Sequence, residues 1–105
     1  MAGVHTIRPN GEIDIATAGP LREELLALVE AEHPDHLVVD LRDVTFMDSS
    51  GLAVLIRVHK QQLQHGGDVT VINPIPSVRR ILRITGLDAA FAPAPDAIPD
   101  AAAGS

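Results

Sequence analysis

The sequence predicts a single-domain α/β fold in which helices pack against one mostly parallel mixed sheet. Short runs rich in β-branched residues alternate with longer segments whose apolar residues recur every three or four positions. This alternating order requires right-handed crossovers between parallel strands. The chain has 105 residues, a length at which one domain buries about 65% of its unfolded surface.

The first two strands are expected to form a hairpin at the edge of the sheet. Residues 4–7 alternate in polarity, Pro9-Asn10-Gly11 interrupts the pattern, and residues 12–15 alternate again. In the second strand Ile13 and Ile15 share one face and Asp14 lies on the other. The residues alone favour a solvated Asp14 over one that faces a site.

The first helix is expected to begin at Thr17 or Gly19, with Pro20 in its first turn, and to end before Pro34. Its buried stripe comprises Leu21, Leu25, Leu28 and Val29.

Two groups of titratable residues near this helix could suggest chemistry, and both favour a plainer interpretation. Glu23 and Glu24 are adjacent, so they cannot face each other as an acid–base pair, but they complement the dipole of the first turn. His33 and His36 have no further ligand cluster nearby. A solvated turn is therefore favoured over a metal site.

The central stretch passes from strand to helix at Asp48-Ser49-Ser50-Gly51. Residues 37–41 and 44–47 read as buried strands, and residues 50–65 read as an amphipathic helix that Gly66-Gly67 ends. Asp48 or Ser49 suits the N-cap, which leaves at least one hydroxyl spare. A phosphate on Ser49 or Ser50 would meet the positive end of the helix dipole and free N–H groups, opposed by Asp48. The inward residues of this helix are expected to be Leu52, Leu55, Ile56, His59 and Leu63.

The last third of the chain predicts a buried strand at residues 69–72, a helix at 76–85 that stops at Gly86, and a short strand at 87–91. The third helix presents Arg79, Arg80 and Arg83, either as a solvated face or as a docking surface for an acidic partner. Residues 1–91 thus form the domain, and the Ala/Pro-rich residues 92–105 are expected to be a flexible tail.

Composition excludes several function classes. The formal net charge is −6, cysteine is absent and only two residues are aromatic. These values argue against a nucleic-acid footprint, disulfides, thiolate metal sites and base-stacking platforms. No leader or long apolar run is visible, so a cytoplasmic protein without membrane contact is expected. Neither a nucleophile elbow nor a Gly-rich phosphate loop is present, so we expect no enzyme and no cofactor.

Four motifs in order carry a resemblance to a known family: GEIDIAT at 11–17, LVVDL at 37–41, FMDSSGL at 46–52 and RILRITGLD at 80–88. Together they resemble the STAS-domain anti-sigma factor antagonists of bacteria, over residues 4–91. The resemblance implies that Ser50, directly before Gly51, is the phosphoacceptor of a partner kinase that is itself the anti-sigma factor. It also implies that Ser49 is a structural neighbour and that Asp14 lies beside the serine.

The function that this resemblance implies is that of a binding switch. The unphosphorylated surface around Ser50, with Arg57 and Lys60, would dock onto the anti-sigma factor serine kinase and release a sigma factor. Phosphorylation of Ser50 would end the interaction, and a phosphatase would restore it. Two alternatives stay open: a STAS scaffold subunit of a transporter or signalling assembly, and a small-ligand or nucleotide-binding module.

Overall fold

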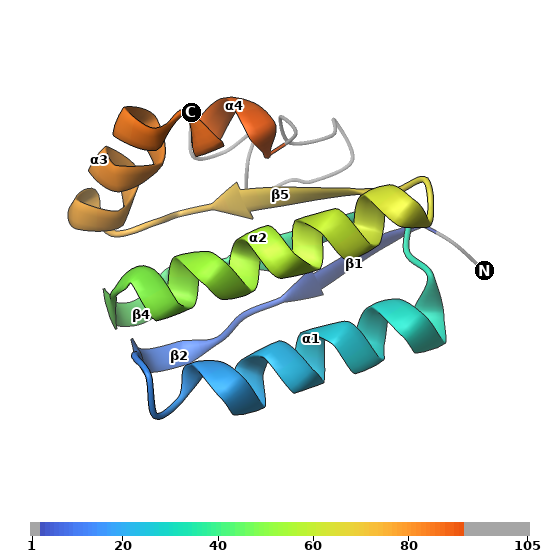
Figure 1. Cartoon of the computed structure of the whole chain (residues 1–105), viewed down its shortest axis with the longest axis horizontal. Helices are drawn as coiled ribbons and strands as arrows, with labels where there is room; N and C mark the ends of the chain where they lie inside the picture. The colour runs from blue at the N-terminus through green and yellow to red at the C-terminus, as the bar shows by residue number, and fades with distance from the viewer. Residues whose placement is uncertain (1–2, 92–105) are drawn as a thin grey trace.

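A computed structural model describes residues 3–91 of the chain, and the tail expected at 92–105 lies outside that range. Strands and helices alternate along most of this part, as the sequence predicts (Figure 1). The elements are β1 (Val4–Ile7), β2 (Asn10–Ile13), α1 (Ala18–Glu32), β3 (His36–Asp40), β4 (Asp43–Met47), α2 (Ser49–Gln64), β5 (Asp68–Ile72), α3 (Pro76–Thr85) and α4 (Leu87–Ala90).

The strands form two small parallel sheets, which confirms the α/β class. One sheet has the order β1-β3-β5 and the other pairs β2 with β4. The expected N-terminal hairpin is wrong, because β1 and β2 never pair with each other. The chain bends between β1 and β2 but keeps the same direction, and it does so again between β3 and β4. β1 therefore pairs in parallel with β3, and β2 pairs in parallel with β4.

Pro9, Asn10 and Gly11, which suggest a hairpin turn in the sequence, lie at this bend instead. The side chain of Arg8 donates to Asp43 over 2.8 Å, joining the two bends. Gly11 adopts a positive φ of 78°, and the register with β4 shifts between Gly11 and Glu12. Glycine in this conformation permits a bulge that a side chain would disfavour. The break at 9–11 was thus correctly detected, but it marks an irregular strand rather than a reversal.

α1 and α2 lie side by side and begin at the same end of the molecule, near the ends of β2 and β4 (Figure 1). Their inner faces bury Leu25, Val29, Val54, Leu55 and Val58 against the strands. The inward face of α2 differs from the expected one at its last turn. Leu63 is 56% exposed, whereas Gln62 is fully buried.

α3 has the predicted bounds and ends at Gly86, whose φ of 78° makes it a left-handed C-cap. Residues 87–91 are not a strand, which corrects the expectation: Leu87–Ala90 form one helical turn, α4. The turn buries Phe91, whose ring meets that of His59 edge-to-face at 5.4 Å. Five apolar-leaning residues carry no periodicity that could separate a strand from a helical turn.

Candidate functional site

The turn between β4 and α2 is a capped helix start. Asp48 is the N-cap, and its carboxylate accepts a hydrogen bond from the Ser50 amide at 2.8 Å. The Asp48 carbonyl accepts from the amides of Gly51 at 3.1 Å and Leu52 at 3.3 Å. These three amides are therefore bonded within the turn, and an anion on Ser50 would interact with the helix dipole rather than with these groups.

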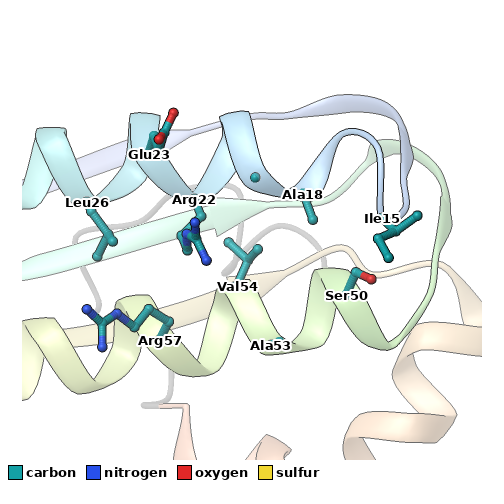
Figure 2. Close-up of a pocket in the computed structure, with 10 residues that line it drawn as sticks. Ile15, Ala18, Arg22, Glu23, Leu26, Ser50, Ala53, Val54 and Arg57 are labelled. Atoms are coloured by element: carbon teal, nitrogen blue, oxygen red, sulfur yellow. The ribbon is translucent and has the colours of Figure 1, made fainter.

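The two serines of the turn have different surroundings. Ser49 is exposed, whereas Ser50 is half-buried and its side chain lines an open groove between α1 and α2 (Figure 2). Gly51 is buried beneath them. A Cβ at Gly51 would lie only 2.5 Å from Cγ of Met47 and 2.9 Å from Cγ2 of Ile13. Glycine therefore lets the start of α2 approach β2 and β4 closely.

Asp14 lies in the loop between β2 and α1, where it organises the backbone. Its carboxylate accepts from the amides of Ala16 at 2.9 Å and Thr17 at 3.2 Å, while its own amide donates to the Thr17 hydroxyl at 2.9 Å. Among residues 3–91 no hydrogen bond joins Asp14 to Ser50. The strand ends at Ile13, so Ile15 does not share one strand face with Ile13 as expected: Ile13 is buried, whereas Ile15 is 87% exposed.

Ile15 and Ser50 share the groove between the N-terminal halves of α1 and α2, which encloses about 880 Å³. Arg57 lines it from α2, and Arg22 lines it from α1 (Figure 2). Within the described part of the chain, neither arginine forms an ion pair. The full lining is Ile15, Ala18, Gly19, Arg22, Glu23, Leu26, Ser50, Ala53, Val54 and Arg57.

The other predicted site residue, Lys60, is exposed on α2 one turn beyond Arg57 and does not line the groove. Sequence reasoning missed Ile15 and Arg22 as groove residues. The sequence pattern places Ile15 at the end of a strand at residues 12–15, and it gives Arg22 no role at the site. One signal in the sequence could have identified Arg22. It lies early in α1, which starts at the same sheet edge as α2, and ligands approach parallel sheets at that edge.

Among residues 3–91, which include every histidine of the sequence, the histidines do not gather into a metal site. His36 pairs with Asp68 over 2.9 Å, and the His33 ring meets that of His65 at 4.6 Å. Within the described residues no group of three or more potential ligands is placed to hold a metal ion. Across the same residues, every helix is too short or too polar to span a bilayer.

The capped serine turn opens a groove at one edge of a parallel α/β layer. The STAS domain family matches residues 2–100, and the chain belongs to this family. The family match therefore confirms the resemblance that the four ordered motifs carry.

Several relatives bear informative names. The chain is 40% identical over 77 residues to the anti-sigma-B factor antagonist of Bacillus subtilis (strain 168), covering 73% of this chain and 69% of that protein. It is 35% identical over 85 residues to the anti-sigma F factor antagonist of Paenibacillus polymyxa, covering 81% and 73%. Among solved structures, an anti-sigma factor antagonist from Mycobacterium paratuberculosis superposes with a TM-score of 0.75 at 34% identity, over 97% of this chain and 85% of that one.

Proposed function

We propose that this chain is an anti-sigma factor antagonist that works by binding rather than by catalysis. In its unphosphorylated form it docks onto an anti-sigma factor serine kinase in the cytoplasm and thereby releases a sigma factor. The observation that carries the proposal is the position of Ser50: its side chain is half-buried but lines an open groove at the start of α2. A kinase can reach it there, which would be impossible for a hydroxyl inside the core.

Phosphorylation of Ser50 is proposed to switch the interaction off. A phosphate adds about −1.5 to −2 charges at neutral pH. It would stand close to the Asp48 carboxylate, which caps the same turn. In an interface that excludes water, such a charge is costly unless the partner supplies a cation. A penalty of about 2.7 kcal/mol already weakens binding a hundredfold. A phosphatase that removes the phosphate from Ser50 then restores the form that binds.

The remaining proposed site residues fall into two groups. Asp14, Asp48 and Gly51 set the backbone on either side of the groove, through the hydrogen bonds and the close approach described above. Ser49, Arg57 and Lys60 are exposed on or beside α2 and are available to touch the partner directly. Loss of the first group would disturb the shape of the docking surface, and loss of the second would remove contacts.

The test uses the kinase encoded in the same genome, with ATP and the full chain. Ser50→Ala is expected to accept no phosphate and to bind the kinase constitutively. Ser49→Ala is the matched control, since it removes the neighbouring exposed hydroxyl and should still be phosphorylated at Ser50. Mass spectrometry locates the phosphate, and a pull-down measures the complex. Phosphate on the Ser50→Ala protein would refute the assignment of Ser50.

A further inference from the structure

Two arginines enter the groove beside Ser50 from opposite helices. Arg22 comes from α1 and extends toward α2, whereas Arg57 lies along α2 with its guanidinium group turned away from Ser50 (Figure 2). Neither is engaged in an ion pair with another residue in the range 3–91. In a chain with a formal net charge of −6, this groove is lined by two arginines and one glutamate, which gives it a local excess of positive charge.

The spacing of Ser50 and Arg57 suits a contact along α2. Seven residues are close to two helical turns, so the two side chains lie on one face about 10 Å apart along the axis. Arg57 is exposed, so its side chain can change rotamer and turn back toward the start of α2, where an extended arginine and a phosphoserine can close that gap. Arg22 approaches the same space from across the groove, so a group on Ser50 could be met from two directions.

We propose that Arg22 and Arg57 form a clamp that holds the phosphoryl group on Ser50 after phosphorylation. The inference rests on the proposed function, in which Ser50 is phosphorylated in the cell. It deepens that function by naming the residues that contact the phosphoryl group. Guanidinium groups suit this role because their planar N–H donors match phosphate oxygens in pairs. The clamped phosphate would occupy the part of the groove beside Ser50 and deny both arginines to a partner.

The acidic groups near the groove oppose the clamp and set its strength. Glu23 lines the groove from α1, Asp48 caps the turn that carries Ser50, and Asp14 lies in the loop next to Ile15. Asp14 and Asp48 accept hydrogen bonds from backbone amides, which offsets part of their charge. Two guanidinium groups that converge on a dianion should therefore prevail over these carboxylates.

The test measures the second pKa of the phosphate. Phosphoserine is installed at position 50 during translation, so that the kinase is not required, and the protein is titrated by phosphorus NMR. Nearby cations favour the dianion, so the wild-type pKa is expected below the ordinary value of about 6. Arg22→Gln and Arg57→Gln should each raise it, and the double variant should raise it by about half a unit or more.

Arg79→Gln on α3 is the matched control, since it removes one exposed arginine outside the groove and should leave the titration unchanged. The start of α2 and its dipole are common to all variants, so only the arginines differ. An identical phosphate pKa in the wild type and the double variant would overturn the clamp. Failure of the kinase to modify Ser50 would instead overturn the proposed function, and the two results are independent.

Discussion

Gly51 is required by packing as well as by its place in the turn. A Cβ there would lie 2.5 Å from Cγ of Met47 and 2.9 Å from the branched methyl of Ile13, both on strands under α2. Gly51→Ala is expected to destabilise the fold by about 1–2 kcal/mol, because overpacking outweighs the gain in helix propensity. Urea unfolding measures the change.

The control for this change is Gly19→Ala, in the first turn of α1, where a Cβ would meet nothing within 4 Å. That variant should be as stable as the wild type or gain up to about 1 kcal/mol. A Gly51→Ala protein at least as stable as the wild type would show that Met47 and Ile13 yield easily.

Gln62 is a polar residue with a structural role inside the fold. Its side chain is fully buried and donates from Nε2 to the carbonyls of Pro34 and Asp68, each at 3.0 Å. It thereby joins the end of α2 to the loop before β3 and to the start of β5. Gln62→Met keeps the length but leaves two carbonyls without this donor, so a loss of about 1–3 kcal/mol is expected.

Gln64→Met is the matched control because Gln64 is exposed on the same helix, where changes usually stay within about 0.5 kcal/mol. Thermal and urea unfolding of both variants test the comparison. Equal stability of the two would mean that the buried hydrogen bonds of Gln62 contribute nothing net.

At the scale of elements, the start of α2 depends on the side chain of Asp48. Asp48→Ala removes the acceptor for the Ser50 amide and should cost about 1 kcal/mol, the usual loss for an N-cap. Asp48→Asn keeps a capping oxygen without the charge and should retain most of the stability. If both variants lose the same stability, the carboxylate acts through its charge on the dipole, and urea unfolding distinguishes the cases.

The sequence predicts elements well where a local residue ends them. α3 has the expected bounds because Pro76 and Gly86 are start and stop signals within the segment itself. The supposed hairpin was wrong because β1 pairs with β3 some thirty residues away, and alternation does not show which strand is the neighbour. Leu63 was misplaced for a similar reason, since the inward face at the end of α2 is set by the carbonyls that bind Gln62.

The candidate site could be predicted in part. The cap at Asp48 and the spare hydroxyl beside it follow from the residue types, and the structure shows both. The groove could not be predicted, because it depends on how α1 and α2 lie against each other and on the early end of β2 at Ile13. The exposure of Ile15 follows from that early end, which the hydrogen bonds of Asp14 and Thr17 impose.

At the scale of the whole molecule, the parallel topology explains why a charge can be added at the site while the packing of the core stays the same. Parallel strands place the starts of α1 and α2 at one end of the layer, so the groove forms there from two helix N-termini (Figure 1). The buried apolar cluster lies between the inner faces of these helices and the strands beneath them. Charge added in the groove therefore acts on the surface and not on the packing beneath it.

Ser50→Asp should accordingly switch binding while leaving the fold intact. The Ser50 side chain lines an open groove, so the free energy of unfolding should stay within about 1 kcal/mol of the wild type. Amide chemical shifts should change only at groove residues of α1 and α2, whereas affinity for the kinase should fall at least tenfold, or about 1.4 kcal/mol. Ser77→Asp places the same charge on an exposed serine of α3, outside the groove, and serves as the control. Shift changes that extend to α3 and β5 would mean that the switch works by a change of fold, because those elements do not line the groove.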